Sequence, residues 1–394
     1  MKRRQILTAG AVATTLAVAA PAAAAPGRAG QGPAKQPPGN GQDTPPGLAK
    51  KDNLAFAAGS TLKIGCAVAG GGHHLSRPYP DPFTADEPYR ELLAAEFTSL
   101  SAENQMKWDH LRPTQDTFNF VDADAIMEFA EAHGQVVRGH TLMWHNQNPA
   151  WVAEGGFTPE QLRAILKDHI ETVVGRYAGR MQQWDVVNEI FDDGAVLRTE
   201  GNLWIRELGP EIIADCFRWA HAADPDALLF FNDYNVDGIN PKSDAYYALI
   251  QELLADGVPV HGFSTQGHLS IRYGFPGDLA DNLQRFADLG LQTAITELDV
   301  RMDLPDGGEP TEAQLAQQAE YYRRVTEAAL AVEGCSSLTL WGVLDRYSWV
   351  PGTFPGEGAA TVLWDDYSRK PAYYAVQDAL AEASGRAGHP ALRR

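Results

Sequence analysis

Short apolar runs alternate with longer amphipathic segments from about residue 62 to the end of the chain. The runs have the length of buried strands, which span about 4–8 residues and are bounded by turn-forming residues. Most of these runs end in polar or aromatic side chains. The eight predicted strands are Leu62–Val68, Phe97–Glu103, Val136–Trp144, Met181–Glu189, Ala227–Tyr234, Gly262–His268, Gln292–Asp299 and Ser337–Leu344.

The segments between the strands have the period of amphipathic helices, and several begin with the proline or threonine that commonly opens a helix. The predicted helices are Asp122–His133, Pro159–Val174, Pro210–Ala223, Pro241–Ala255, Thr311–Val332 and Pro371–Ala381. These repeats predict an α/β fold, a single (β/α)8 TIM barrel over residues 51–385, with a C-terminal tail at 386–394. A doubly wound open sheet is the alternative, but no Gly-x-Gly-x-x-Gly turn follows the first strand.

Polar side chains gather where the predicted strands end. In a (β/α)8 barrel the carboxyl ends of the strands meet on one face, and that face carries the active site. A single polar strand end could be a satisfied structural group, whereas seven such ends predict a site. The residues concerned are Glu103, Asn104, His140, Trp144, Asn188, Glu189, Asn232, Asp233, Gln266, His268, Glu297, Asp299 and Trp341.

The chain is acidic, with a formal net charge of −19 over 394 residues. Apolar residues make up 44% and charged residues 21%, which is enough apolar material for a large core. An acidic surface repels nucleic acid and anionic lipid. We therefore expect a neutral substrate and no nucleic-acid partner. A monomer in solution is also expected.

The N-terminus has the pattern of an export signal. Lys2-Arg3-Arg4-Gln5-Ile6-Leu7 is a twin-arginine pattern, and an Ala/Val/Leu/Thr stretch and the small residues Ala22–Ala25 follow it. Residues 1–25 are therefore predicted to be a signal peptide, and the Pro/Gly-rich residues 26–50 a disordered lead. The mature protein is expected to be secreted, extracellular and not bound to a membrane.

Neither a disulfide framework nor a metal site is predicted. The three cysteines are Cys66, Cys216 and Cys335. They are odd in number and far apart, so at most one disulfide can form, and a core of this size needs none. His73 and His74 lie in a Gly-rich loop, while His140 and His145 lack the spacing of a zinc-binding helix. No cofactor is expected.

Glu189 and Glu297 are the candidate catalytic pair. They end the fourth and seventh predicted strands, so a barrel can bring both carboxyl groups to its mouth. Two facing carboxyl groups can cleave an acetal. A separation of about 5–5.5 Å permits a nucleophile and an acid, and one of about 6.5–9.5 Å leaves room for water and inverts the product. The sequence leaves this separation open.

The neighbours of each glutamate suggest its role. Asp299 lies two residues after Glu297, and His268 ends the adjacent strand, so an Asp–His–Glu chain can hold Glu297 ionised as the nucleophile. Glu189 is then the acid and later the base. The amide of Asn188 could bind a sugar hydroxyl beside the reacting carbon. Asn188, His268 and Asp299 are thus predicted supporting residues.

Other side chains at the predicted mouth suit a sugar. Polar groups that could bind hydroxyls are Glu103, Asn104, Lys107, His140 and Gln147. Tryptophans that could stack on a pyranose ring are Trp108, Trp144, Trp341 and Trp349. Trp184, Trp204 and Trp219 are interpreted as core residues.

Taken together, these motifs resemble the family 10 glycoside hydrolases, chiefly endo-β-1,4-xylanases. The matching pieces cover roughly residues 62–380 in family order. The resemblance implies a retaining mechanism with Glu189 as acid/base and Glu297 as nucleophile, xylan and xylo-oligosaccharides as substrates, and Glu103, Asn104 and Lys107 binding the second sugar on the non-reducing side. The motifs are Glu103-Asn104-Gln105-Met106-Lys107-Trp108, Gly139-His140-Thr141-Leu142-Met143-Trp144-His145, Trp184-Asp185-Val186-Val187-Asn188-Glu189, Asn232-Asp233-Tyr234, Gln266-Gly267-His268, Thr296-Glu297-Leu298-Asp299 and Trp341-Gly342-Val343. Tyr234 and Gln266 are further substrate-binding candidates from these motifs.

The chain departs from this resemblance in a few places. Cys335 matches one half of a disulfide found in many relatives, but alanine occupies the partner position, so no bridge is expected there. Val350 stands where relatives often have arginine, and the 70–88 segment is long enough to reshape one end of the cleft. Two alternatives stay open: a hydrolase of the same type with a shifted β-glycoside preference, and a catalytically silent xylan-binding barrel.

The twin-arginine pattern predicts export of the folded protein, with cleavage near Ala23–Ala25. Replacing Arg3 and Arg4 by lysine should leave an active enzyme inside the cell, measured as activity in cell and medium fractions. Undiminished secretion of this variant would instead indicate the general secretory route.

Overall fold

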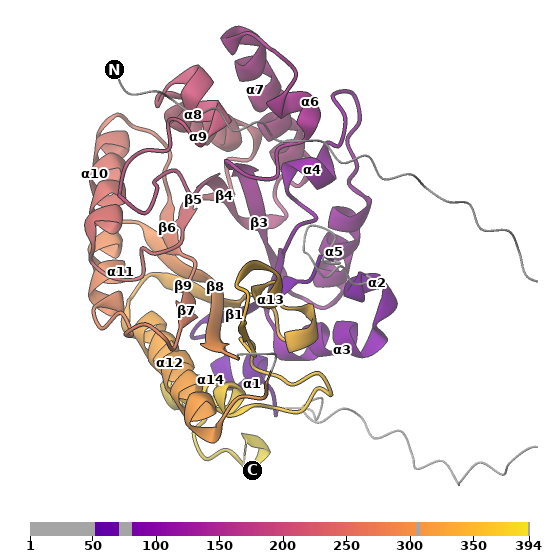
Figure 1. The fold of residues 1–394 in the computed structure, drawn as a ribbon, viewed down its shortest axis with the longest axis vertical. Helices are drawn as coiled ribbons and strands as arrows, with labels where there is room; N and C mark the ends of the chain where they lie inside the picture. Colours follow the sequence, from indigo (N-terminus) through magenta and orange to yellow (C-terminus); the bar gives the residue numbers. More distant parts are fainter. Residues whose placement is uncertain (1–51, 71–80, 305–307, 393–394) are drawn as a thin grey trace, which may run out of the picture. The chain divides into compact units, whose positions relative to one another are not determined.

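The computed structural model describes residues 52–70, 81–304 and 308–392. Within them, eight parallel strands form a closed barrel with helices around its outside (Figure 1). The ring closes because β9 pairs with both β1 and β8. The predicted (β/α)8 TIM barrel is thus confirmed and the open sheet is excluded. The barrel strands are β1 (Lys63–Val68), β2 (Ser99–Ala102), β3 (Val136–Met143), β4 (Met181–Asn188), β5 (Leu228–Asp233), β6 (Gly262–Thr265), β8 (Gln292–Asp303) and β9 (Cys335–Leu340).

All six predicted helices are present, with ends shifted by at most two residues. The longer helices are α3 (Glu87–Glu96), α5 (Val121–Ala132), α7 (Pro159–Arg176), α9 (Ile212–Ala223), α10 (Pro241–Ala255), α11 (Leu279–Ala287), α12 (Glu312–Ala331) and α14 (Pro371–Ala383). The short ones are α1 (Leu54–Ala58), α2 (Pro82–Ala85), α4 (Trp108–Leu111), α6 (Ala150–Ala153), α8 (Leu203–Leu208), α13 (Val350–Thr353), η2 (Asp345–Tyr347) and η3 (Pro390–Leu392).

Local sequence explains where the longest helices begin. Thr158 and Thr311 each form a capping box, in which the threonine hydroxyl accepts from the third helical N–H and a glutamine side chain accepts from the threonine N–H. This satisfies N–H groups that have no partner inside the helix. Pro159 follows at the first helical position, where a missing N–H costs nothing.

The predicted strand Gly262–His268 is broken in the structure. β6 ends at Thr265, the chain turns at Gly267 with a φ of 82°, and a short strand, β7 (His268–Ser270), starts again. β7 pairs with β8, which runs to Asp303 instead of ending at Asp299. The far end of β8 also pairs with β10 (Glu357–Gly358). This correction matters because the new register places His268 directly opposite Asp299.

Helices α1 and α14, from opposite ends of the barrel sequence, meet at a buried carboxyl group, Glu96. One of its oxygens accepts from the Leu54 N–H at 2.8 Å and from the Tyr373 hydroxyl at 2.6 Å. Leu54 opens α1, and Tyr373 lies in α14. Burial raises the pKa of Glu96 to about 7, although these hydrogen bonds and Arg369 act in the opposite direction. Glu96 thereby links α1 to α14 through hydrogen bonds.

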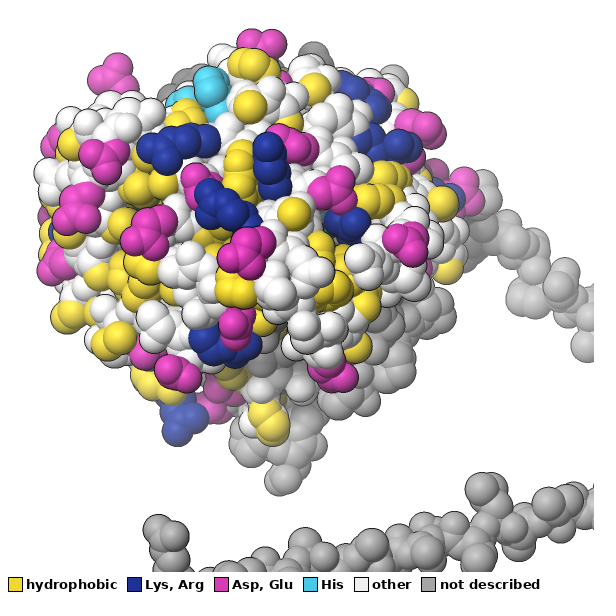
Figure 2. Space-filling view, turned by 90° about the horizontal axis from the view of Figure 1, so that it is seen from above, with side chains coloured by type: hydrophobic (Ala, Val, Ile, Leu, Met, Phe, Trp, Pro, Cys, Tyr) yellow, Lys and Arg dark blue, Asp and Glu magenta, His cyan; other side chains and the backbone are white. Residues whose placement is uncertain are grey.

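The surface carries charges of both signs. On the face in Figure 2, lysine and arginine side chains are interspersed with aspartate and glutamate. Among the described residues, no helix has the length and apolarity needed to span a bilayer. The residues predicted to be a signal peptide and a disordered lead, together with His73 and His74, lie outside the described residues. The three cysteines are buried and free.

Packing inside the barrel wall gives a stability prediction. Gly139 in β3 lies against Trp184, and a methyl group added there would overlap the indole ring. Gly139→Ala should therefore lower the free energy of unfolding by about 1–3 kcal/mol, measured by denaturant or thermal unfolding. Gly175→Ala is the matched control, because Gly175 is a helical residue with no atoms near its added Cβ. The control should be neutral or stabilising by up to about 1 kcal/mol. Equal losses in both variants would contradict this explanation.

Candidate active site

A cleft of about 690 Å³ opens at the carboxyl ends of the strands. The two predicted catalytic glutamates, His268 and ten of the eleven predicted substrate-binding residues line it; Trp108 does not. The lining residues are Glu103, Asn104, Lys107, His140, Trp144, His145, Asn146, Gln147, Glu189, Asp193, Arg198, Tyr234, Asn235, Gln266, His268, Glu297, Arg301, Trp341, Trp349, Thr353 and Phe354. Predicted site residues that are far apart in the sequence therefore lie together in one cleft.

Glu189 directly follows β4 and is held by contacts to both its backbone and its carboxyl group. Its backbone has a φ of 55°, a left-handed conformation that costs a non-glycine residue about 1–2 kcal/mol. Its N–H donates to the Asn232 carbonyl at 3.0 Å. One carboxyl oxygen accepts from Trp144 Nε1 at 2.8 Å and the other from Gln266 Nε2 at 2.9 Å. The carboxyl group is therefore fixed in direction.

Glu297 lies inside β8 and takes part in the predicted Asp–His–Glu chain. His268 Nε2 lies 3.3 Å from one oxygen of Glu297, and His268 Nδ1 lies 3.0 Å from Asp299. Trp349 Nε1 donates to the same Asp299 oxygen at 2.7 Å. The other Glu297 oxygen accepts from Asn232 Nδ2 at 2.8 Å. The structure thus brings together the three side chains of the predicted Asp–His–Glu chain.

The charges around Glu297 favour its ionised form. Burial alone would raise the pKa of Glu297, but His140, His268 and Arg138 outweigh burial and hold the pKa well below its usual range. Burial acts to lower the pKa of His268, yet Asp299 and Glu297 raise it to about 10. These shifts favour an imidazolium at His268, which lies between the carboxyl groups of Asp299 and Glu297, and Glu297 faces the cleft.

A buried ion-pair cluster lies beneath Glu297. Arg138 and Asp185 are paired side chains with 2% and 0% exposure, and Arg138 Nη2 is also 3.7 Å from Glu297. His140 Nδ1 lies 2.8 Å from Asp185 and 3.8 Å from Glu297. The ligand atoms of His140, Asp185 and Glu297 lie within 4.8 Å of one another, a spacing that a metal site would also have. Because Arg138 already supplies positive charge to both carboxylates, an internal ion-pair network explains their arrangement.

The Glu103 end of the cleft is built from β2 and the residues just after it. The Asn104 side-chain oxygen accepts from Lys107 Nζ at 3.2 Å and from Gln147 Nε2 at 3.3 Å, and Asn104 Nδ2 has no partner among the described residues. Burial raises the pKa of Glu103 to about 7, although the Gly70 N–H and Lys107 act to lower it. Burial lowers the pKa of Lys107, although nearby carboxylates act to raise it. These directed polar groups suit uncharged hydroxyls.

Aromatic side chains complete the walls of the cleft. The Lys107 ammonium lies 4.8 Å from the ring centre of Trp144, and the Trp341 ring stands edge-on to His140. The Tyr234 hydroxyl accepts from Arg198 at 2.6 Å. Trp108 does not reach the cleft: it is 3% exposed, stacked on a buried histidine, and its Nε1 donates to the Leu142 carbonyl. The prediction that Trp108 offers a sugar face is therefore wrong.

Two residues contribute more to the site than the sequence indicated: Asn232 was expected at the barrel mouth but without a role, and Arg138 was not predicted there. Asn232 bonds Glu297 and also donates to the Asn188 side-chain oxygen at 2.9 Å, which leaves Asn188 Nδ2 without a partner among the described residues. Arg138 lies within an apolar run of β3, where an unpaired charge would be costly. A charge in the middle of a buried strand is the signal that could have identified Arg138.

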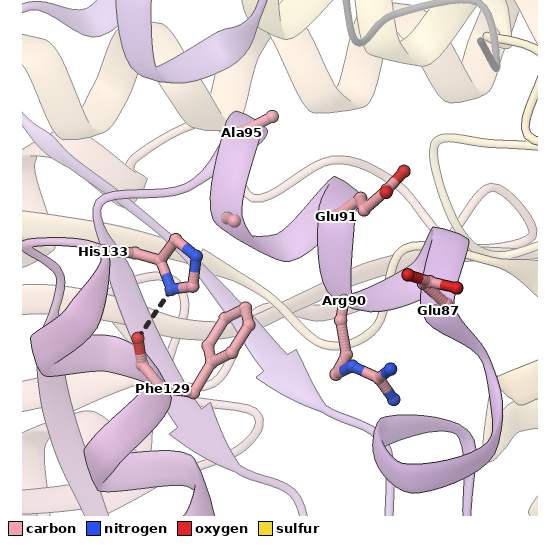
Figure 3. A pocket seen from close by; sticks show the side chains of 7 residues that line it. Glu87, Arg90, Glu91, Ala95, Phe129 and His133 are labelled. Atoms are coloured by element: carbon pink, nitrogen blue, oxygen red, sulfur yellow. Dashed lines mark hydrogen bonds between the residues drawn. The ribbon is translucent and has the colours of Figure 1, made fainter.

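A second hollow, of about 400 Å³, lies on the outer helices. Figure 3 shows Glu87, Arg90, Glu91 and Ala95 of α3 facing Phe129 and His133 at the end of α5. His133 Nδ1 bonds the Phe129 carbonyl within its own helix. None of these residues comes from a strand end, so this hollow lies apart from the polar cluster at the barrel mouth.

The fold and the site together define a class of enzyme. A (β/α)8 barrel with an ionised glutamate, a second oriented glutamate and a cleft of tryptophans and amides has the equipment of a glycoside hydrolase. The sequence profile described as Glycosyl hydrolase family 10 matches residues 55–379. The chain belongs to this family.

Relatives and solved structures agree with the profile. The chain is 42% identical to endo-1,4-beta-xylanase B of Thermotoga neapolitana, over 82% of this chain and 90% of that protein. It is 40% identical to an endo-1,4-beta-xylanase of Agaricus bisporus, over 80% and 93%. The structure of xylanase 10B from Thermotoga petrophila RKU-1, solved with xylobiose, matches with a TM-score of 0.77 and 40% identity, over 84% and 97% of the two chains.

The electrostatics of Glu297 predict a pH effect. Removing the positive charge of His268 should raise the pKa of Glu297, because that charge favours the carboxylate. In His268→Asn, the acidic limb of kcat/KM should therefore move to higher pH than in the parent enzyme, measured on an aryl glycoside. His133→Asn, at an exposed histidine far from the barrel mouth, is the control. An unmoved acidic limb in His268→Asn would show that His268 does not set the charge of Glu297.

Proposed function

We propose that this chain is a retaining endo-β-1,4-xylanase that cleaves internal β-1,4-xylosidic bonds of xylan. The observation that carries this proposal is the charge arrangement at Glu297, a buried carboxylate kept ionised beside an imidazolium. A protein that only bound xylan would have no use for a buried nucleophile of this kind. The names of the relatives support the choice of xylan over other β-glycosides.

The first step forms a covalent intermediate. A Glu297 carboxylate oxygen attacks C1 of the sugar, the bond from C1 to the glycosidic oxygen breaks, and Glu189 gives its proton to that oxygen. The Trp144 and Gln266 hydrogen bonds would aim Glu189 at the leaving oxygen. The leaving part of the xylan chain departs as an alcohol, and the rest stays bound to Glu297 as an ester.

The second step releases the sugar and restores the enzyme. Once Glu297 is esterified, its negative charge is gone and Glu189 can take a proton from water. The resulting hydroxide attacks C1 and displaces Glu297 as a carboxylate. Two successive displacements at C1 retain the configuration. The His268–Asp299 pair would then stabilise Glu297 as a leaving group, as it stabilises the free carboxylate before attack.

Binding away from C1 would hold the chain for these steps. Asn188 Nδ2 is free to donate to a hydroxyl beside the reacting carbon, and Asn104 Nδ2 and Lys107 to the next sugar on the non-reducing side. Trp341 and Trp349 would form the apolar platform. Such remote contacts raise kcat when they tighten in the transition state. We further propose that the enzyme is a monomer that is secreted by the twin-arginine route.

The two glutamates can be told apart by chemical rescue. General acid catalysis contributes about 10²–10⁴-fold, and a good leaving group needs little of it. Glu189→Ala should therefore nearly abolish xylan hydrolysis yet still react with an activated aryl β-xyloside, and added azide should speed turnover and give the β-glycosyl azide. Glu297→Ala should be inactive in water, and azide should give only the α-product. Product configuration is measured by NMR.

Glu154→Ala, at an exposed glutamate outside the cleft, is the matched control and should behave as the parent enzyme. If the azide products had the opposite configurations, the roles assigned to Glu189 and Glu297 would be the wrong way round. Full activity of both active-site variants would refute the site. Release of reducing sugar from cellulose or barley glucan at rates above those from xylan would refute the proposed substrate.

A further inference from the structure

The strained backbone at Glu189 is held by hydrogen bonds on both sides of the residue. A non-glycine residue keeps a φ of 55° only where its surroundings enforce it. The Glu189 N–H donates to the Asn232 carbonyl at 3.0 Å. The next peptide group, between Glu189 and Ile190, is held at both ends. Its carbonyl accepts from Arg198 Nε at 3.0 Å, and its N–H donates to the Tyr246 hydroxyl at 3.1 Å. These three contacts therefore set the direction in which the Glu189 side chain leaves the backbone.

Tyr246 lies on α10, outside the barrel, and it is fully buried. It does not line the cleft. Its ring packs edge-on against Phe191, with the ring centres 4.8 Å apart. The ring also contacts Phe231 of β5 and Phe263 of β6. A substrate in the cleft would not touch Tyr246, so any effect of its hydroxyl on the reaction must pass through the Ile190 N–H.

A buried ion pair fixes the Tyr246 hydroxyl. The hydroxyl donates to one oxygen of Asp233 at 2.6 Å, and Lys242 Nζ lies 2.8 Å from the other oxygen. Lys242 and Tyr246 are one turn apart on α10, so they reach the same carboxyl group from one face of the helix. The Asn240 side chain caps the start of α10 by accepting from the Ser243 N–H at 2.9 Å. The oxygen that receives the backbone N–H is therefore held in one position.

A hydroxyl can serve both neighbours here because it accepts one hydrogen bond and donates another. Ile190 and Asp233 are both buried, and a buried polar group that loses its partner is costly. Phenylalanine in place of Tyr246 would fill the same space but leave both groups without this partner. The peptide group after Glu189 could then rotate toward another acceptor, and the Glu189 side chain would move with it. General acid catalysis contributes about 10²–10⁴-fold, and a misplaced acid loses part of it.

We propose that Tyr246 is a positioning residue for the acid/base Glu189, and that it acts through the peptide N–H of Ile190. This inference rests on the proposed function, in which Glu189 protonates the leaving oxygen. The Glu189 carboxyl group keeps its own partners, Trp144 and Gln266, so loss of the Tyr246 hydroxyl should misplace the acid without removing it. The effect should therefore be largest where proton donation matters most.

The experiment compares Tyr246→Phe with the parent enzyme on two aryl β-xylobiosides. Phenolate is a poor leaving group that needs a proton, whereas dinitrophenolate leaves readily without one. In Tyr246→Phe, kcat/KM should fall about 10-fold on the phenyl glycoside and less than about 2-fold on the dinitrophenyl glycoside. Both values report bond cleavage in the first step. Their ratio does not depend on the fraction of the protein that is folded, so reduced stability alone cannot change it.

Tyr373→Phe is the matched control. The Tyr373 hydroxyl is also buried and also donates at 2.6 Å to a buried carboxyl group, Glu96, but Tyr373 lies on α14 and does not line the cleft. Both variants should have a lower Tm, because each leaves a buried carboxyl oxygen with one donor fewer. The ratio of the two kcat/KM values should change in Tyr246→Phe alone. An unchanged ratio in Tyr246→Phe, or an equal change in Tyr373→Phe, would overturn the proposal.

Glu189→Ala separates failure of this inference from failure of the proposed function. On the same two substrates it should change the ratio of kcat/KM values far more than Tyr246→Phe does. If Glu189→Ala left the ratio unchanged, or if the parent enzyme cleaved neither substrate, the proposed function itself would fail. A changed ratio in Glu189→Ala with an unchanged ratio in Tyr246→Phe would refute only the role of Tyr246.

Discussion

The hydrogen-bonded chain from Asp299 through His268 to Glu297 is the interaction on which the charge arrangement of the candidate active site depends. A buried carboxyl group ordinarily prefers to be neutral. Here the adjacent imidazolium, helped by His140 and Arg138, reverses that preference. The cost of burying these charges is offset because each one faces an opposite charge. The second glutamate, Glu189, is instead held by neutral donors, so the two carboxyl groups are distinguished by their surroundings.

Backbone features in the sixth and seventh strand–helix units make this chain of contacts possible. The turn at Gly267 interrupts the strand and lets His268 restart as β7, in register with Asp299 on a lengthened β8. Arg301, farther along the same strand, ties the carbonyls of β7 to β10 through Glu357. The same elements also line a separate cavity of about 650 Å³, which shares His268 and Arg301 with the cleft. One local irregularity therefore organises both the surroundings of Glu297 and the neighbouring surface.

Much of this arrangement can be predicted from the sequence, because alternating strand and helix periods and polar strand ends are local signals. They give the barrel, the two glutamates and His268 as a partner of Glu297. The break at Gly267 and the pairing of β10 depend on contacts between distant residues and leave no local pattern. Burial is equally nonlocal: Trp108 has the composition of a sugar-binding residue, yet it stacks in the core. Asn232 carries no charge that would mark it as a partner of Glu297.

The junction at Glu96 has a consequence for how the chain acquires its structure during synthesis. Glu96 joins α1, near the beginning of the barrel, to Tyr373 of α14, near its end. β1 likewise cannot pair with β9 until β9 has been synthesised, more than 260 residues later. Almost the whole polypeptide must therefore emerge from the ribosome before the ring can close. Contacts between residues so far apart in sequence also slow folding. Until then the early strands keep an open edge, the kind of surface that chaperones cover.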